Sequence, residues 1–276
     1  MRSDPRARRC VTPFVHLGPT ADERPVLVTI PHTGTRVPTE IAARFASDAI
    51  RCLPMTDWHL HALYDFLPGL GIDVLHASWH RFVVDLNRPP EPMALYPGRF
   101  ETGLVAERTF QGEPIYASPP DADDVRARKA LYYEPYHRRL ADLLEDKRKR
   151  FGFVVLIDAH SVASAPSLLH GRLTEDVYLG NRDGVTCGPA LVDYFASAFE
   201  SAQLEVALNA PYKGGYTTDH YGRLPGVQAL QIEMCQRVYM DEADPDSATN
   251  HPRFEATRSL LRNVFEGFLD TIKTSP

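Results

Sequence analysis

The stretch FVVLIDAHSVAS, residues 153–164, begins as an apolar run and passes directly into Asp158 and His160. Its first residues have the composition of a strand that is buried on both faces, as in the centre of an α/β sheet. An acid and an imidazole then follow with no turn signal before them. Because α/β sheets bind ligands at the carboxyl ends of their strands, we predict that Asp158 and His160 face a functional site.

Other short apolar runs rich in Val and Ile lie along the chain, separated by helical stretches, which is typical of an α/β domain. Besides the run at 153–158, strands are predicted at VLVTI (26–30), IDVLH (72–76), RFVVDL (81–86), DVYLG (176–180) and VQALQIEM (227–234). Several are apolar at consecutive positions, so helices are expected on both faces of the central sheet. We predict a single domain over residues 1–276, in which residues 1–20 form an N-terminal extension.

Two helices are predicted from periodicity and charge. The segment 121–150 is amphipathic, with acidic residues at its start and basic residues at its end, which matches the helix dipole. Pro135 should kink or split this helix, because proline has no N–H and its ring clashes with the preceding turn. From about residue 253, apolar side chains recur at near-helical spacing and predict a packing helix.

Two regions rich in Pro and Gly lack a regular pattern. One runs from Asn87 to about residue 120, and the other covers 209–226. Long loops in compact domains often bind ligands or close over them. The stretch KGGYTTDHYG in the second region contains three glycines that permit hinge motion. We predict a lid there, with Tyr216 among the residues that cap and bind the substrate.

Composition excludes several classes of protein. The formal net charge is -6 and the pI is near 6.0, so no basic field exists for nucleic acid or an anionic membrane. The four cysteines show neither a CxxC pair nor zinc-finger spacing, which favours a reducing compartment. No apolar run approaches the roughly eighteen residues of a membrane span. We expect a cytoplasmic protein that acts on a small molecule and has no nucleic-acid or membrane partner. The sequence does not determine its oligomeric state.

Polar side chains of reactive types stand at the carboxyl ends of four predicted strands. They are His32, the pair Asn87 and Arg88, His160, and Glu233. Two histidines, one carboxylate and a separate glutamate are the parts of a catalytic zinc site, which has three protein ligands and an open position for water. His32 and His160 are the candidate imidazole ligands, and Glu233 is the candidate base.

The third metal ligand has two candidates, Asp57 in MTDWHLH and Asp158. Asp158 lies two residues from His160 and could instead orient a ligand, whereas Asp57 opens a new segment and is free to point inward. We rank Asp57 first. The binuclear site of the arginase-like ureohydrolases has the pattern Asp-x-His-x-Asp, but position 162 is Val. We therefore discount a site with two metal ions.

Seven short motifs occur together in this chain. They are PHTG (31–34), TDWH (56–59), VVDLNRPP (83–90), DAHS (158–161), GR (171–172), KGGY (213–216) followed by HYG, and QIEMCQ (231–236). In this order and spacing they resemble the N-formylglutamate amidohydrolase family, over most of the chain from about residue 24 to about residue 245. That family is similar in fold to the zinc carboxypeptidases, in the phosphorylase/hydrolase-like class. The resemblance therefore implies a central mixed β-sheet flanked by helices.

The resemblance also implies roles for individual residues. The implied ligands of Zn²⁺, or of another divalent metal, are His32, Asp57 and His160. Glu233 would act as general base and acid, and Asn87 with Arg88 would bind a substrate carboxylate. Zinc carboxypeptidases carry an acidic ligand three residues after the first histidine, whereas this chain has Thr35 there. The carboxylate ligand then has to come from elsewhere, and Asp57 of TDWH fits the pattern of the family that the chain resembles.

The implied reaction is hydrolysis of N-formyl-L-glutamate to L-glutamate and formate, a step in histidine degradation. This substrate has two carboxylates, and the planar fork of one arginine grips only one of them well. Candidates for a second cation are Arg172 in the GR motif, Arg81 and Lys213. The alternatives are a deacylase of another N-acyl acidic amino acid, such as N-formyl- or N-acetyl-aspartate, and a non-catalytic binding protein. The presence of a candidate base argues against a binding protein, which needs none.

Overall fold

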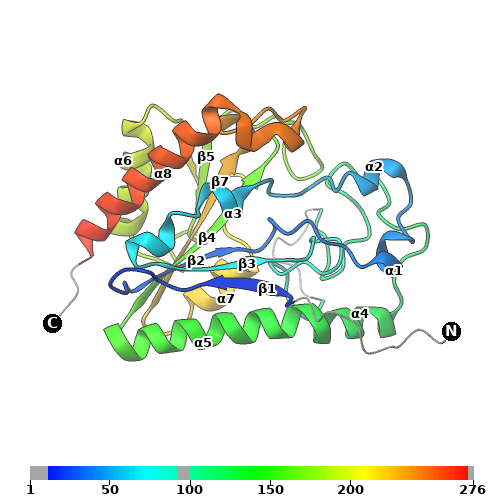
Figure 1. The fold of residues 1–276 in the computed structure, drawn as a ribbon, viewed down its shortest axis with the longest axis horizontal. Coiled ribbons are helices and arrows are strands. Elements are labelled where there is room, and N and C mark those ends of the chain that lie inside the picture. The colour runs from blue at the N-terminus through cyan, green and yellow to red at the C-terminus, as the bar shows by residue number, and fades with distance from the viewer. Residues whose placement is uncertain (1–11, 93–99, 273–276) are drawn as a thin grey trace.

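The computed structural model describes residues 12–92 and 100–272. Within them lies a seven-stranded sheet with the strand order β1-β3-β2-β4-β7-β5-β6 (Figure 1). The strands are β1 (Phe14–Leu17), β2 (Val26–Ile30), β3 (Asp73–Ala77), β4 (Val154–Val162), β5 (Val177–Gly180), β6 (Val206–Leu208) and β7 (Val227–Cys235). The central strands β3, β2, β4 and β7 run parallel. β1 runs antiparallel to β3, β5 runs antiparallel to β7, and β6 runs parallel to β5. The predicted α/β fold with a central mixed sheet is confirmed.

Five of the six predicted strands are present, and the strand predicted at 81–86 is wrong. Residues 81–86 form turns, and Phe82 and Val83 pack with Phe45 and Tyr116 in an apolar cluster separate from the sheet. An apolar run in the sequence indicates that a segment is buried. A buried irregular segment and a buried strand therefore have the same pattern. The sequence pattern therefore could not separate the two.

The first edge of the sheet begins earlier in the chain than predicted. β1 lies inside the predicted N-terminal extension and pairs with β3 from Phe14 opposite Ala77 to Leu17 opposite Val74. This part of residues 1–20 therefore belongs to the sheet, while residues 1–11 lie outside the described residues. The short strands β1 and β6 are too brief to leave a clear periodic pattern.

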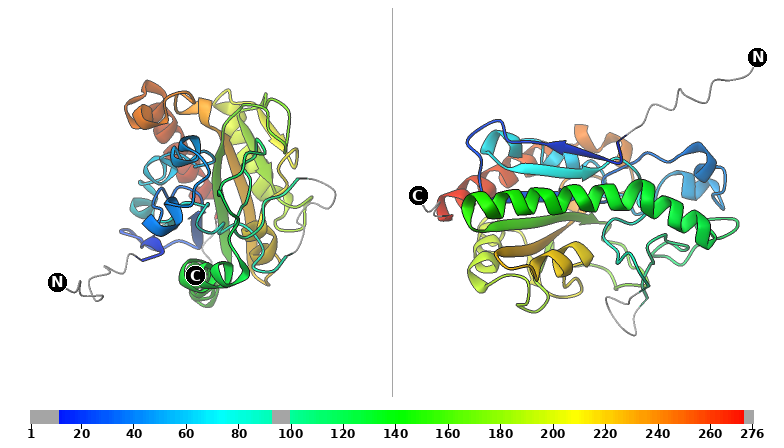
Figure 2. Two further views of the ribbon diagram at one scale, coloured as in Figure 1. Left: turned by 90° about the vertical axis from the view of Figure 1, so that its right-hand side faces the viewer. Right: turned by 90° about the horizontal axis from the view of Figure 1, so that it is seen from below.

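Helices cover both faces of the sheet (Figures 1 and 2). One face carries α3 (Leu60–Leu63), α6 (Pro189–Ser201) and α8 (Pro252–Thr271), and the other carries α5 (Glu134–Phe151) and α7 (Tyr216–Gly222). Because side chains alternate along a strand, β4 directs Ile157 to the first face and Leu156 to the second. Asp158 and His160 continue the row of Leu156. The second face thus becomes polar toward the carboxyl edge of the sheet.

The predicted helix at 121–150 is confirmed, with an interruption near Pro135. It consists of α4 (Ala122–Arg128), a π-turn (Lys129–Tyr133) and α5, which follow one another as a single rod (Figure 2). Pro135 lies in the first turn of α5, where its missing N–H leaves the preceding turn without a regular α-helical bond. α8 confirms the predicted C-terminal packing helix. In the described ranges, no helix has both the length and the apolar character to cross a membrane.

Shorter helices complete the fold. The α-helical ones are α1 (Thr39–Ala42) and α2 (Asp48–Arg51), and the 3₁₀ ones span Leu67–Leu70, Gln236–Val238 and Pro245–Asn250. The first three of these elements lie between β2 and β3, and the last two lie between β7 and α8. The irregular region predicted after Asn87 has no helix or strand in its described part before Ala122.

The structure does not support a lid at KGGYTTDHYG. Most of this stretch forms α7, which packs against β7 and β4 and buries Thr217, Thr218 and Tyr221. A Cβ atom added to Gly222 would collide with Thr186. The glycine therefore permits close helix packing rather than hinge motion.

Candidate active site

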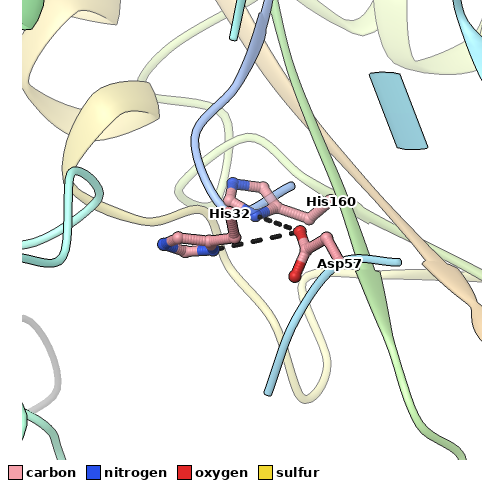
Figure 3. A group of neighbouring side chains, drawn as sticks. All are labelled: His32, Asp57 and His160. Carbon is pink, nitrogen blue, oxygen red and sulfur yellow. Dashed lines mark hydrogen bonds and ion pairs between the residues drawn. The ribbon is translucent and has the colours of Figure 1, made fainter. Parts of the chain in front are cut away.

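His32, Asp57 and His160 meet beyond the carboxyl edge of the sheet, although separate segments supply them (Figure 3). His32 follows β2, His160 lies in β4, and Asp57 precedes α3. One ligand atom from each residue lies within 4.8 Å of the other two, and all three side chains are buried. Two imidazole nitrogens and one carboxylate oxygen form a donor set that suits Zn²⁺ and related divalent ions.

Both imidazole rings turn the same nitrogen toward Asp57. The Nδ1 atoms of His32 and His160 lie 3.9 Å and 3.2 Å from Oδ2 of Asp57. On the opposite side of each ring, Nε2 of His32 lies 2.7 Å from Oδ1 of Asp85. Nε2 of His160 lies 3.1 Å from Oδ2 of Asp158. A carboxylate behind each ring favours a proton on Nε2 and leaves the lone pair of Nδ1 for a metal ion.

This geometry separates the two candidates for the carboxylate ligand. Asp57 faces both Nδ1 atoms, and its Oδ2 accepts a hydrogen bond from the backbone N–H of Ser161 at 3.0 Å. Asp158 lies behind His160, where its Oδ1 accepts a hydrogen bond from Thr29 at 2.8 Å. The arrangement supports Asp57 as the metal ligand and Asp158 as the group that orients His160.

The segment that carries Asp57 has an unusual backbone. Leu53, Met55 and His59 have φ values of 54°, 72° and 55°, in the left-handed region that side chains other than glycine rarely adopt. Each such residue costs on the order of 1–3 kcal/mol unless neighbouring contacts hold it. Nε2 of His59 donates to the carbonyl of Pro245 at 2.9 Å. Backbone of this kind gathers at functional sites, where it fixes a side chain in a required position.

Glu233 lies beside the candidate ligands. His160 and Glu233 are opposite each other in the parallel pairing of β4 and β7, so both project from the same face of the sheet. Nε2 of Gln231 donates to Oε2 of Glu233 at 3.1 Å. The backbone N–H of Gly215 donates in turn to Oε1 of Gln231 at 2.7 Å. The carboxylate of Glu233 is therefore held by the side-chain amide of Gln231, which is positioned by Gly215 at the start of α7.

Burial and neighbouring charges shift the pKa values in this cluster. Burial raises the pKa of Glu233 to about 8, with His160 opposing the shift and Asp57 adding to it. Burial lowers the pKa of His32 to about 4. Burial alone would also lower the pKa of His160, but the charge of Asp158 outweighs it and raises this pKa well above its ordinary value. His32 is therefore neutral near pH 7, whereas His160 would have to release a proton in order to bind a metal ion.

A pocket of about 440 Å³ opens in front of Glu233, and two arginines line it. Arg81 is buried, and its Nη2 donates to Oδ2 of Asp85 at 2.7 Å. The guanidinium lies 5.0 Å from the centre of the Phe110 ring. Its Nε has no hydrogen-bond partner within the described residues. Because a buried donor without a partner is unfavourable, this N–H is available to a ligand in the pocket.

Asn87 and Arg88 also line the pocket. Nε of Arg88 donates to the carbonyl of Thr102 at 3.0 Å, which orients the guanidinium. Nδ2 of Asn87 donates to Oδ2 of Asp158, the carboxylate behind His160, at 3.2 Å, and its Oδ1 accepts from the N–H of Thr217 at 2.7 Å. The Asn87 side chain thus supports a candidate metal ligand. Its predicted role as a direct substrate contact competes with these bonds.

Three residues predicted to bind substrate do not line the pocket. They are Arg172, Lys213 and Tyr216. Arg172 is exposed to solvent. Nζ of Lys213 pairs with Asp183 at 2.7 Å, and the ring of Tyr216 stacks on His220 with centroids 4.9 Å apart. The two arginines that line the described pocket, Arg81 and Arg88, both lie in the segment 81–88. The ring of Tyr216 in α7 instead lies against other aromatic rings.

Sequence reasoning missed two residues of the site, Asp85 and Tyr212. Asp85 stands two residues before Asn87, within the run at 81–86 that the sequence pattern predicts to be a strand. As a strand residue it carries no signal of a role in the site. Tyr212 lines the pocket, and its buried hydroxyl has no hydrogen-bond partner in the described part of the chain. No pattern in the sequence points to Tyr212, because its role depends on tertiary placement.

The chain is similar to known proteins over most of its length. Residues 24–240 match the sequence model described as N-formylglutamate amidohydrolase. The N-formylglutamate deformylase of Pseudomonas aeruginosa is 39% identical over 250 residues, which cover 89% of this chain and 92% of that protein. The N-formylglutamate deformylase of Pseudomonas putida is 37% identical over the same shares. A crystal structure of N-formylglutamate amidohydrolase from Ralstonia eutropha JMP134 aligns with a TM-score of 0.82 at 27% identity, over 95% of this chain and 99% of that one.

Proposed function

The chain belongs to the N-formylglutamate amidohydrolase family, as its motifs predict, and we propose that it hydrolyses N-formyl-L-glutamate to formate and L-glutamate. The observation that carries this proposal is one pocket in which a buried His-Asp-His set, Glu233 and two arginines meet. Hydrolysis of an acidic N-formyl amino acid needs activation of water, a proton carrier and cations for carboxylates. The pocket contains residues suited to each of these tasks.

A divalent metal ion, with Zn²⁺ as the first candidate, is the cofactor that these residues fit. His32, Asp57 and His160 would hold it, because their ligand atoms converge and a carboxylate stands behind each ring. Such an ion supplies Lewis-acid polarisation of the formyl carbonyl and lowers the pKa of water to about 7. Another divalent metal with the same preference for nitrogen and oxygen ligands remains an alternative.

Glu233 is the proposed proton carrier. In its ionised form the carboxylate takes a proton from the attacking water, and in its protonated form it returns that proton to the leaving nitrogen. The C–N bond of the formamide breaks, the water oxygen stays with formate, and the nitrogen leaves as the amine of glutamate. Burial raises the pKa of Glu233 to about 8, so its protonated form is accessible near neutral pH. Gln231 holds the carboxylate in place for both transfers.

Arg81 and Arg88 are the proposed partners of the two substrate carboxylates. Both line the pocket, and within the described residues the Nε–H of Arg81 has no hydrogen-bond partner. Two separate guanidinium groups satisfy two carboxylates better than one, because each planar fork matches one carboxylate. The hydroxyl of Tyr212, which has no partner among the residues that the structure describes, is a further proposed donor to the substrate. This set favours an acidic amino acid over a neutral one.

The wider setting follows from the proposed reaction. We propose that the step belongs to histidine degradation, as the family resemblance implies. Cys52, Cys187 and Cys235, the cysteines in the described ranges, are free thiols, which supports the cytoplasmic location proposed for the chain. Deacylation of another N-acyl acidic amino acid would use the same residues. A non-catalytic binding protein would have no use for a buried glutamate beside three metal-binding side chains.

A formate-release assay combined with metal analysis of the same preparation tests the proposal. We expect bound divalent metal and rapid release of formate from N-formyl-L-glutamate. N-formyl-L-aspartate, N-formyl-L-glutamine and N-acetyl-L-glutamate should react at least about tenfold more slowly, since each lacks a matched carboxylate or carries a larger acyl group. Equal rates with the glutamine derivative would contradict carboxylate recognition. Tight binding of N-formylglutamate without formate release would favour the binding protein instead.

A further inference from the structure

The segment from Arg81 to Arg88 supplies the pocket with side chains but forms no strand. Its carbonyl groups therefore lack the partners that a neighbouring strand would provide. Buried backbone groups are almost always hydrogen-bonded, so donors have to come from elsewhere. For four carbonyl groups, those of Phe82, Val83, Leu86 and Arg88, donors come from side chains of the rod formed by α4, the π-turn and α5. Tyr116, outside the rod, also donates to the carbonyl of Phe82. This rod lies outside the pocket and has no part in the proposed chemistry.

Arg128, at the end of α4, serves the first half of the segment. Its Nη1 lies 3.3 Å from the carbonyl oxygens of both Phe82 and Val83. The other two nitrogens, Nε and Nη2, donate to the carboxylate of Asp124 at 2.9 Å and 2.8 Å. Nη1 also donates to the hydroxyl of Tyr116 at 2.7 Å. The whole guanidinium is buried and engaged, so it fixes the backbone at this point.

Tyr133 and His137 serve the second half. Nε2 of His137 donates to the carbonyl of Leu86 at 2.9 Å, and the hydroxyl of Tyr133 donates to the carbonyl of Arg88 at 2.9 Å. Nδ1 of His137 lies 3.0 Å from the hydroxyl of Tyr221, which can donate to it from α7. The two rings of Tyr133 and His137 lie against each other with centroids 4.1 Å apart. They form a continuous surface on one side of the rod.

The π-turn explains how these side chains come to share that side. Arg128 and Tyr133 are five residues apart, and in a regular α-helix they would point about 140° away from each other. In a π-turn the bonds connect residues five apart, so such residues lie one above the other. Tyr133 and His137 are four residues apart, which is the normal α-helical stacking distance. The extra residue of the π-turn therefore aligns Arg128 with Tyr133 and His137.

We propose that Arg128, Tyr133 and His137 are positioning residues of the active site, aligned by the π-turn at Lys129–Tyr133. They act through the backbone of residues 82–88 and not on the substrate. The inference rests on the proposed function in two respects, the candidate metal site and the use of Arg88 for a substrate carboxylate.

The contacts divide the effects between two ends of the segment. Leu86 stands between Asp85 and Asn87, whose side chains lie against His32 and His160. The bond from His137 therefore supports the metal ligands. The bond from Tyr133 reaches Arg88 and supports substrate binding. Loss of either hydrogen bond should produce a different defect, which a general loss of stability would not do.

Tyr133→Phe tests the substrate end, and Tyr136→Phe is the matched control. Tyr136 lies in the same rod, and its buried hydroxyl has no hydrogen-bond partner within the described residues. For Tyr133→Phe we expect kcat/KM with N-formylglutamate to fall about three- to tenfold, mainly through KM, the range for one lost hydrogen bond. N-formylbutylamine, which has no carboxylate, should be hydrolysed as slowly as by the wild type. Tyr136→Phe should match the wild type with both substrates.

His137→Leu tests the metal end without any assay of turnover. Competition with a chelator should show metal affinity about tenfold weaker than in the wild type, as for lost support of a ligand. This readout separates the inference from the proposed function, because it does not depend on formate release. The inference is overturned if Tyr133→Phe behaves like Tyr136→Phe, or if it slows both substrates equally. It is also overturned if His137→Leu binds metal as tightly as the wild type.

Discussion

Nε2 of His32 lies 2.7 Å from Oδ1 of Asp85, and the other oxygen of the same carboxylate accepts a hydrogen bond from Arg81 at 2.7 Å. One buried carboxylate thus connects a candidate metal ligand to a cation of the substrate pocket. Burial alone would raise the pKa of Asp85, but the charges of Arg81 and His32 outweigh burial and hold this pKa well below its usual range. Asp85 therefore stays ionised and fixes the proton of His32 on Nε2.

The first prediction concerns this connection. Asp85→Asn keeps the size of the side chain but removes its charge, so Nε2 of His32 loses a strong acceptor. Metal affinity, measured by competition with a chelator, should fall about 10- to 100-fold, which is typical for loss of an orienting partner. Asp183→Asn is the control, because its partner Lys213 does not line the pocket. An Asp85→Asn variant with wild-type metal affinity would remove Asp85 from the site.

The second prediction concerns the proton carrier. Glu233→Gln keeps a polar side chain of the same size but cannot take a proton from water. Turnover of N-formylglutamate should fall at least about 100-fold, while the metal content measured by atomic spectroscopy stays at the wild-type level. Activity near that of the wild type would mean that another group carries the proton.

The third prediction concerns Tyr212, which lines the pocket and whose buried hydroxyl has no hydrogen-bond partner in residues 12–92 and 100–272. Tyr212→Phe removes this hydroxyl and keeps the ring between His170 and Tyr178. If the hydroxyl donates to the substrate, kcat/KM for N-formylglutamate should fall about tenfold, while thermal stability stays equal to or above that of the wild type. Steady-state kinetics and a melting curve together check this. A fall in stability without a kinetic change would mean that the hydroxyl has a structural partner.

The fourth prediction concerns pH and stability. Burial lowers the pKa of His137 to about 4, from an ordinary value of 6.5. Between these two pH values the unfolded chain binds a proton that the folded chain does not, so folding becomes less favourable as the pH falls from about 6.5 to about 4. The contribution can reach about 3 kcal/mol. His137→Gln should show a shallower loss of unfolding free energy over this window, measured by urea unfolding at several pH values. Parallel pH profiles for the two proteins would contradict the shift.

Much of the central sheet and of the candidate metal site could be predicted from the sequence, for a local reason. In β4 and β7 the alternation of side chains carries an apolar row directly into Asp158, His160 and Glu233. Short-range periodicity therefore determined both the strands and the face on which these groups lie. The order of the motifs then identified the family.

The remaining parts of the site depend on contacts between distant segments. Phe82 and Val83 of the run at 81–86 are buried in the cluster that contains Phe45 and Tyr116, and Arg128 donates to the carbonyl of Phe82. No local pattern reveals these contacts. Arg81, Arg172 and Lys213 are equivalent as charges in a sequence, and only the tertiary fold places the first of them in the pocket. The same holds for Tyr212. Sequence patterns therefore predicted the candidate metal ligands and the candidate base, but not the other side chains that surround them in the pocket.

The parallel pairing of β2, β4 and β7 has a consequence for how the chain folds. Thr29 lies opposite Asp158, and His160 lies opposite Glu233, so the site joins segments that are far apart in the sequence. Contacts of this kind form slowly, because long loops have to close before they are stabilised. Helices, by contrast, form early and locally. During refolding from urea, helical circular dichroism should therefore recover before formate release does, and the return of activity should mark the closure of the central strands.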